Sequence, residues 1–251
     1  MYKGKKIRIG TLNIFNNICH SIKEKFLNYD SEYIYNISRK NLLFKHLFSN
    51  SFDIICLQEV DLFMINELKK KCLEYNFTLY ASPDNIKSSK NNNCIIYKKN
   101  FKLLDENFFD LNSVVSKYFM NYSSESRCEQ KENDISHLQK LSGVYELITK
   151  GRVKNTHMEH PAQLRKDKAF YLLPELSIEP FKSAFKEING NEPIFTNKTL
   201  SFSGCIDFIF YKELIPLSAK TIPSNLNDIK ILPNEHFPSD HILLMSEFFV
   251  V

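Results

Sequence analysis

The run Asp53–Gln58 (DIICLQ), followed directly by Glu59, is the stretch that indicates the fold of this chain. A short, continuous apolar run is typical of a strand that is covered on both faces, as in α/β proteins. Polar residues that follow such strands lie where α/β proteins build their sites. The sequence therefore predicts an inner strand that delivers a carboxylate, Glu59, to one end of a sheet.

Helical patterns flank this run on both sides. Upstream, Asp30 or Ser31 is a candidate N-cap for a helix that extends roughly to Asn50. Apolar residues recur at helical spacing at Ile34, Ile37, Phe44 and Phe48 before the run, and at Leu62, Ile65, Leu68, Cys72 and Tyr75 after it. Both stripes predict helices that pack against the core.

Other segments complete the predicted pattern. The strand Ile7–Phe15 brings Asn13 to its C-terminal end. Further predicted strands are Cys94–Lys98, Phe101–Leu111, Ile206–Tyr211 and Ile242–Val250, with a tight turn at Lys99–Asn100 and a helix at Gly143–Lys150. We expect one domain, 1–251, in which 112–141 forms an irregular junction because it shows no sustained period.

Composition excludes several classes of protein. The chain is 43% hydrophobic and 13% aromatic, which is enough for a packed core and argues against disorder. The net charge of +4 permits a polyanionic partner such as RNA without demonstrating one. Six scattered cysteines, no apolar run of transmembrane length and no signal-peptide pattern predict buried free thiols, no membrane partner, and a cytoplasmic or nuclear location.

Four short motifs carry the chemistry, and their joint order is more specific than any one of them. They are Asn13 in TLN, Glu59 in LQEV, Asp207 in CIDFIFY and His241 in FPSDH, each at or beside a predicted strand end. This combination resembles the endonuclease/exonuclease/phosphatase superfamily. The resemblance implies a two-sheet α/β sandwich with outer helices.

Longer matches point to one branch of that superfamily. The segments Ser142–Val153 (SGVYELITKGRV), Phe195–Tyr211 (FTNKTLSFSGCIDFIFY) and Leu232–Phe248 (LPNEHFPSDHILLMSEF) resemble the nuclease subunit of the Ccr-Not deadenylase complex. The resemblance implies a Mg²⁺-dependent 3′-5′ exoribonuclease that shortens poly(A) tails and releases AMP. RNA and other Ccr-Not subunits are the partners it implies.

The chemistry of phosphodiester hydrolysis explains the residue types. Glu59 suits a hard cation such as Mg²⁺, which needs only one or two carboxylates because it keeps several waters. Asn13 would contact the phosphate or assist the metal shell. The resemblance implies that Asp207 holds His241 for acid/base or transition-state work, with Asp240 as a neighbour of the histidine.

Two interpretations of Phe202 are open. It matches the family position whose ring packs on the target adenine, a contact worth about 1–3 kcal/mol. The alternative is a core phenylalanine, in a chain with 21 of them.

The chain departs from the family pattern before Ser142. The family's Asn-Thr-His motif and its Asp-x-Asn motif are not plainly present, and the chain passes from the strand ending at Leu111 through a polar stretch into Ser142. This indicates a fold that is truncated internally. Asp134, with Ser136, is either a remnant of the second motif and a candidate metal ligand or part of a solvated loop.

His157, in Asn155–His157, mimics the missing histidine motif, but its place after Val153 favours a surface histidine. Losing one positioned acid or base costs about 10²–10⁴-fold in rate. The alternative function is therefore a catalytically impaired remnant that binds RNA or a deadenylase-complex partner.

Overall fold

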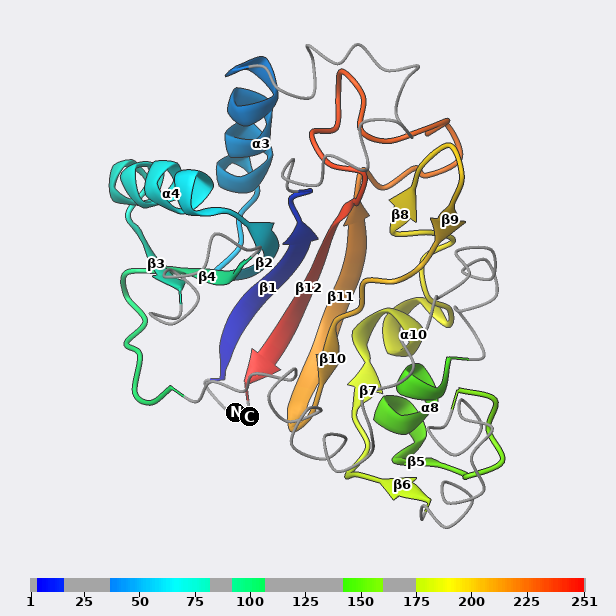
Figure 1. Cartoon of the computed structure of the whole chain (residues 1–251). Helices are drawn as coiled ribbons and strands as arrows, with labels where there is room; N and C mark the ends of the chain where they lie inside the picture. Colours follow the sequence, from blue (N-terminus) through cyan, green and yellow to red (C-terminus); the bar gives the residue numbers. More distant parts are fainter. Residues whose placement is uncertain (1–3, 16–36, 82–91, 107–141, 160–174, 251) are drawn as a thin grey trace, which may run out of the picture.

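A single six-stranded mixed sheet forms the centre of the molecule (Figure 1). The computed structural model describes residues 4–15, 37–81, 92–106, 142–159 and 175–250. The sheet has the order β11-β12-β1-β2-β4-β3 and consists of β1 (Lys5–Asn13), β2 (Ile54–Val60), β3 (Phe77–Ala81), β4 (Asn92–Lys98), β11 (Leu214–Ile222) and β12 (Leu243–Val250). The predicted α/β fold is confirmed.

Helices and short strands surround this sheet. The helices are α3 (Ile37–Ser49), α4 (Leu62–Glu74), α8 (Gly143–Lys150) and α10 (Ala184–Asn189). Two-residue strands form three small ribbons: β5 (Arg152–Val153) with β6 (Leu176–Ser177), β7 (Lys182–Ser183) with β10 (Phe210–Tyr211), and β8 (Asn197–Lys198) with β9 (Ser203–Gly204). Among the described residues, these ribbons accompany the six-stranded sheet, and the second extended sheet of the expected sandwich is not present.

The register of the sheet positions the candidate site. Strand β1 runs parallel to β2 and antiparallel to β12, and Asn13 lies opposite Gln58. Because parallel strands end at the same edge of a sheet, Asn13 and the residue after Gln58 are delivered to one place. That residue is Glu59.

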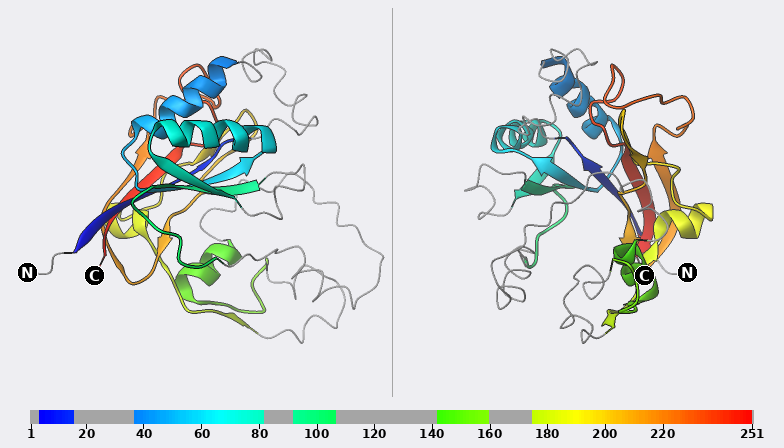
Figure 2. Two further views of the ribbon diagram at one scale, coloured as in Figure 1. Left: turned by 90° about the vertical axis from the view of Figure 1, so that its left-hand side faces the viewer. Right: turned by 45° about the vertical axis from the view of Figure 1, so that its right-hand side comes forward.

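Figure 2 shows the layers of the molecule. Two apolar clusters hold these layers together. Helices α3 and α4 cover one face of the sheet, where Leu47, Ile65 and Leu68 are fully buried against Leu57 and other strand residues. The predicted core-facing stripes are confirmed at Phe44, Ile65, Leu68 and Cys72, with Phe48 partly buried. The two ends of the α4 stripe are wrong, because Leu62 and Tyr75 are 42% and 51% exposed. On the opposite face, the second cluster is built from Phe185, Phe195, Tyr211, Leu244 and Phe248, among others.

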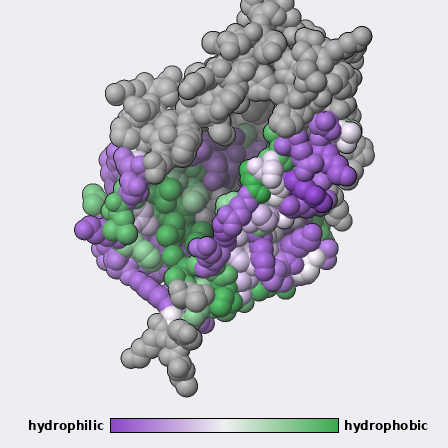
Figure 3. Space-filling model, turned by 90° about the horizontal axis from the view of Figure 1, so that it is seen from below, coloured by the Kyte–Doolittle hydropathy of each residue, from purple (hydrophilic) through white to green (hydrophobic). Residues whose placement is uncertain are grey.

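The opposite face of the sheet is only partly covered over β2, β4 and β3. Along β4, Cys94 and Ile96 are 1% and 0% exposed toward the helices, whereas Ile95 between them is 40% exposed. Ile95 pairs with Cys56 and Tyr80, which are half-buried. Figure 3 views the molecule from this side and shows apolar residues between polar rims.

The predicted strand Phe101–Leu111 is wrong in the part that the structure describes. The turn at Lys99–Asn100 is present, but 101–106 is irregular instead of forming a strand. Strand β4 already has β2 and β3 as neighbours, so no edge of β4 remains for a following strand. The rest of that prediction, 107–111, lies outside the described residues, as do 30–36 of the first helix and the junction 112–141.

Strand predictions in the C-terminal half were correct for β12 and too long for Ile206–Tyr211. Only Phe210–Tyr211 is a strand, because the backbone N–H groups of Ile206 and Asp207 donate to Thr196 Oγ1 instead of to a neighbouring strand. Two strands of the six-stranded sheet, β3 and β11, were not predicted. Strand β11 contains Pro216, which an edge strand accommodates at the bulge that follows it.

The cysteines in the described part of the chain are free thiols, as predicted: Cys56, Cys72, Cys94 and Cys205. Burial raises the pKa of Cys72, Cys94 and Cys205 to about 12, so these thiols stay protonated at neutral pH. None of the described helices combines the length and apolar character needed to cross a bilayer.

The Asp53 side chain links the residue before β2 to β1 and β4 through hydrogen bonds to Arg8 and Lys98. Its contribution to the stability of the fold can be tested. Its carboxylate accepts hydrogen bonds from Lys98 Nζ (2.8 Å) and Arg8 N (2.8 Å). Burial alone would raise its pKa, but the bond from Lys98 and then that from Arg8 hold the pKa of Asp53 below its ordinary value. The contribution is therefore present above pH 4 and is lost as the pH falls through the lowered pKa.

We expect Asp53→Asn to lower Tm by about 2–4 °C at pH 7, the shift that ~1 kcal/mol produces in a chain of this size. The difference from the unsubstituted protein should shrink as the pH is lowered toward 3. Thermal unfolding followed by circular dichroism measures it. Asp228→Asn, at an exposed carboxylate that pairs with Asn225, is the control. A pH-independent difference would contradict the assignment.

Candidate functional site

The first half of the candidate site lies at the ends of β1 and β2. Asn13 Nδ2 donates to Glu59 Oε1 at 2.8 Å, and Phe15 N donates to Asn13 Oδ1 at 3.0 Å. This network assigns the orientation of the amide. Asn13 therefore fixes the Glu59 carboxylate from one side while its own oxygen is held by the turn that ends β1.

The backbone at both strand ends is strained. Glu59 has φ +58° within an irregular pairing between Leu57 and Val60, and Phe15 has φ +58°. Non-glycine residues in this region cost about 1–3 kcal/mol each and persist only where their surroundings hold them. A bulge of this kind turns a side chain away from the regular alternation of its strand. In this chain it reorients Glu59 at the end of β2.

The second half is a histidine held by a carboxylate. Asp207 Oδ2 lies 2.7 Å from His241 Nδ1, and the side chains are 15% and 9% exposed. Asp207 is itself held by Thr196, whose hydroxyl accepts from Asp207 N at 2.9 Å. A carboxylate on Nδ1 fixes the tautomer of the ring and leaves Nε2 for chemistry.

Asp240 lies beside the same histidine. Its Oδ1 is 3.9 Å from His241 Nε2, and its Oδ2 accepts from Asn197 Nδ2 at 3.0 Å. Asn197 belongs to the β8–β9 ribbon and forms an isolated bridge with His241. The ribbon is therefore joined directly to the candidate site.

The two halves meet through Ser239. Its Oγ donates to Asn13 O at 2.6 Å and accepts from His241 N at 3.1 Å. The negative charge of Glu59 also contributes to raising the pKa of both Asp240 and His241. The structure thus brings Asn13 and Glu59 together with Asp240 and His241.

Burial and charge act in opposite directions at this site. Burial raises the pKa of Asp240, and the nearby Glu59 charge adds to that rise. Burial lowers the pKa of His241, but the hydrogen bond and charge of Asp207, followed by the charges of Asp240 and Glu59, raise it above its ordinary value overall. The site therefore favours a protonated imidazole among carboxylates.

The side chains fit a hard cation at Glu59. Mg²⁺ takes oxygen ligands, retains waters and needs only one or two protein carboxylates. Among the described residues, no three His, Cys, Asp or Glu side chains are grouped as a ligand cluster. The Glu59 charge acts on the buried Asp240, and a divalent cation would offset this concentration of negative charge.

The remaining predicted residues have different outcomes. Phe202 is half-buried and absent from both apolar clusters, and it lies in the turn between β8 and β9, where its N–H donates to Thr199 Oγ1. His157 is half-buried against Gly143, with its Nδ1 accepting from Glu159 N. Asp134 lies outside the described residues.

Sequence reasoning missed several residues that build the site. Thr196, Asn197 and Ser239 lie inside the quoted motifs, so their proximity to Asp207 and His241 in sequence was an available signal. Gln58 hydrogen-bonds Thr11 across the two parallel strands, which links the LQE and TLN motifs directly.

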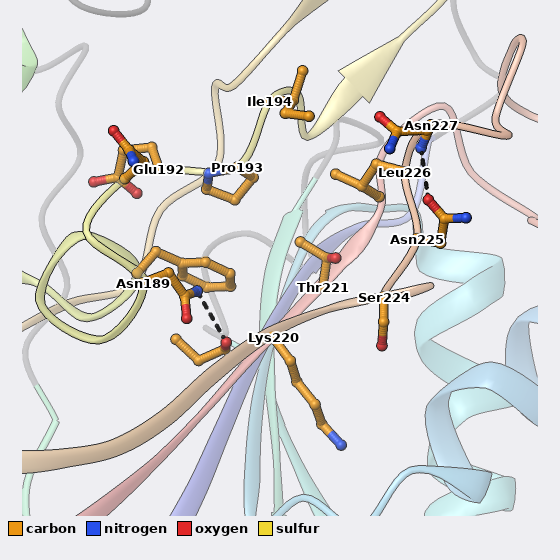
Figure 4. Close-up of a pocket in the computed structure, with 13 residues that line it drawn as sticks. Asn189, Glu192, Pro193, Ile194, Lys220, Thr221, Ser224, Asn225, Leu226 and Asn227 are labelled. Atoms are coloured by element: carbon orange, nitrogen blue, oxygen red, sulfur yellow. Dashed lines mark hydrogen bonds between the residues drawn. The ribbon is translucent and has the colours of Figure 1, made fainter.

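A separate pocket of about 430 Å³ lies between α10 and β11 (Figure 4). Thr221 and Leu226 line it together with Phe185, and Asn189 closes one side by donating to Ala219 O. Its lining contains none of the predicted site residues, so this pocket is separate from the candidate site.

The fold defines the class of protein. The crystal structure of ANGEL2, a 2′,3′-cyclic phosphatase, superposes with a TM-score of 0.69 at 14% identity, covering 98% of this chain and 96% of that one. An endonuclease/exonuclease/phosphatase from Bacteroides vulgatus superposes with a TM-score of 0.50 at 12% identity, covering 98% of this chain and 100% of that one. The chain has the endonuclease/exonuclease/phosphatase fold.

Sequence comparison points to a narrower group. A probable CCR4-Not complex 3′-5′-exoribonuclease subunit Ccr4 of Vairimorpha ceranae is 37% identical over 110 residues, which cover 43% of this chain and 21% of that protein. The protein of the same name from Enterocytozoon bieneusi is 26% identical over 302 residues, covering 93% of this chain and 63% of that protein. No family model matches the sequence.

This chain is shorter than the proteins it resembles. It spans less than two thirds of the length of these curated relatives. The alignments with the relatives from Enterocytozoon bieneusi and Encephalitozoon cuniculi run over 302 and 320 residues, although this chain has 251. Both relatives therefore carry residues within the aligned region that this chain lacks, as the predicted internal truncation requires.

Proposed function

We propose that the chain is a Mg²⁺-dependent 3′-5′ exoribonuclease that shortens poly(A) and releases AMP. The observation that carries the proposal is the meeting of the Asn13–Glu59 pair with the Asp207–His241 pair through Ser239. The similarity in sequence to proteins named 3′-5′-exoribonuclease subunits supports the substrate class.

The reaction requires a water oxygen to attack phosphorus at the last phosphodiester of the RNA. The bond from phosphorus to the 3′ oxygen breaks, AMP leaves, and the shortened RNA keeps a 3′ hydroxyl. Glu59 would hold Mg²⁺, which when bound neutralises charge on the phosphoryl oxygens. Asn13 keeps the Glu59 carboxylate in place through its 2.8 Å hydrogen bond.

His241 would act at the phosphoryl group through Nε2. Asp207 occupies Nδ1, so the ring keeps one tautomer when neutral, and its positive charge is stabilised when it is protonated. A protonated imidazole can stabilise the charge that develops on a phosphoryl oxygen or donate a proton. Asp240, 3.9 Å from Nε2, contributes to keeping that proton on the ring.

The direct experiment is a hydrolysis assay with purified chain and a 5′-labelled RNA that ends in a run of adenosines. We expect a 3′-shortened ladder and AMP in the presence of Mg²⁺, and neither product in EDTA. An RNA ending in uridines measures base preference. The absence of metal-dependent AMP release would refute the proposal.

Phe202 is proposed to stack on the terminal adenine. Phe202 is half-buried, belongs to neither apolar cluster, and lies in the turn between β8 and β9. Strand β8 contains Asn197, which forms a bridge with His241. We expect Phe202→Ala to raise KM for adenosine-tailed RNA by about 5- to 100-fold with little change in kcat, because stacking is worth about 1–3 kcal/mol. Steady-state kinetics measure the effect.

Two matched variants make the Phe202 experiment specific. Phe202→Tyr retains an aromatic face and should keep KM near the original value. Leu200→Ala, at a residue 58% exposed in the same turn, should leave KM unchanged. Equal KM values for Phe202→Ala and Leu200→Ala would contradict the stacking role.

The second candidate function is a catalytically impaired chain that binds RNA or a Ccr-Not partner. Two observations favour it: the two absent motifs, and alignments that are longer than the chain. It predicts RNA binding by fluorescence anisotropy without AMP release. Metal-dependent turnover by the 251-residue chain would exclude it. Capture of a Ccr-Not subunit by the chain tests the proposed partner separately.

A further inference from the structure

Arg39 is a buried cation that contacts both sides of the candidate site. It lies in the first turn of α3 and is 6% exposed. Its Nε donates to Pro238 O, and its Nη2 donates to Ile14 O at 2.6 Å and Phe15 O at 2.9 Å. Burying a guanidinium is unfavourable unless its N–H groups are paired, so these carbonyls and the cation depend on one another.

The carbonyls that Arg39 binds belong to the segments that carry the site. Ile14 and Phe15 follow Asn13 directly, and Phe15 N holds the Asn13 side chain that positions Glu59. Pro238 directly precedes Ser239 in the segment that continues to His241. Arg39 thus acts on the same two segments that the Ser239 hydroxyl joins.

We propose that Arg39 is a positioning residue that holds the Asn13–Glu59 pair at a fixed separation from the Asp207–His241 pair. This inference rests on the proposed function, because a fixed separation matters only if both pairs act on one phosphate. A planar guanidinium suits the task since its donors point in fixed directions and it never loses its charge. A lysine has a single donor atom and cannot reproduce the arrangement.

The test compares Arg39→Lys with Leu43→Ala. Leu43 lies on the same helix and is 1% exposed in the core, so its truncation destabilises α3 but removes no hydrogen bond to the site segments. We expect Arg39→Lys to lower kcat for AMP release by about 10- to 100-fold, the cost of a small misplacement, with KM changed by less than about twofold. Leu43→Ala should keep kcat when assayed well below its Tm.

A second readout does not depend on activity. In ¹⁵N–¹H spectra, Arg39→Lys should shift the backbone amides of both Phe15 and His241, whereas Leu43→Ala should leave them in place. If the unsubstituted chain shows no hydrolysis, the proposed function fails while these spectra still decide the role of Arg39. Unshifted amides in Arg39→Lys, or the same kcat in the two variants, would overturn the inference.

Ser239→Ala extends the test should Arg39→Lys not fold. It removes the hydroxyl that joins Asn13 O to the His241 segment without burying an unpaired charge. The expected result is the same pattern, with a lowered kcat, an unchanged KM and shifted Phe15 and His241 amides. A Ser239→Ala variant with unchanged spectra and kcat would show that the links between the two halves do not set the geometry.

Discussion

Replacing Glu59 by glutamine is expected to lower kcat for AMP release by about 100- to 1,000-fold, the cost of removing one preorganised electrostatic contact. The amide keeps the size of the side chain and an oxygen that can accept from Asn13 Nδ2, so the turn at β2 should persist. It lacks the negative charge that would hold Mg²⁺. The Mg²⁺ concentration for half-maximal activity should therefore rise as kcat falls.

The measurement is a titration of initial rate against Mg²⁺ at saturating RNA. Glu74→Gln is the matched control, because Glu74 sits on α4 with a 55% exposed side chain in a surface pair with Lys71. Its Mg²⁺ dependence should not change. An unaltered Mg²⁺ dependence in Glu59→Gln would remove Glu59 from the metal site and with it the proposed chemistry.

Asp207→Asn is expected to lower kcat by about 10²–10⁴-fold while the fold remains intact. Asp207 Oδ2 receives the Nδ1 proton of His241 at 2.7 Å, and an amide in its place can present a donor to the ring and favour the other tautomer. Asp207 N remains bonded to Thr196 Oγ1 in either case. The decrease in kcat should therefore result from the altered state of His241 and not from a change in the local backbone.

The same variant should move the titration of His241 to lower pH. Burial lowers the pKa of His241, and Asp207 supplies the hydrogen bond and charge that raise it above its ordinary value. Without the carboxylate, burial has less opposition, so the folded pKa falls. Carbon-detected or proton NMR of the ring and the pH–rate profile should shift in the same direction. Asp228→Asn provides the control, and an unmoved His241 pKa would contradict the pairing.

Elements with a strong local pattern were predictable from sequence. Strands β1, β2, β4 and β12 and helices α3, α4 and α8 lie where hydrophobic periodicity indicated them, within the described residues. Strand β11, for which no prediction was made, contains Pro216, and its edge place in the sheet makes the proline acceptable. Residues 101–106 do not form the predicted strand, because both places beside the preceding strand β4 are taken by β2 and β3.

The candidate site, like the fold, was predictable from the sequence only in part. By itself the sequence determined which polar residues lie at or beside the ends of predicted strands, because apolar runs and the polar residues that border them are local features: Asn13, Glu59, Asp207 and His241. Only the tertiary structure decided that Ser239 and Arg39 join these residues into one site, since those contacts link segments about 200 residues apart. Hydrogen bonds between such distant segments depend on the register of β1 against β2 and β12, which no local pattern encodes.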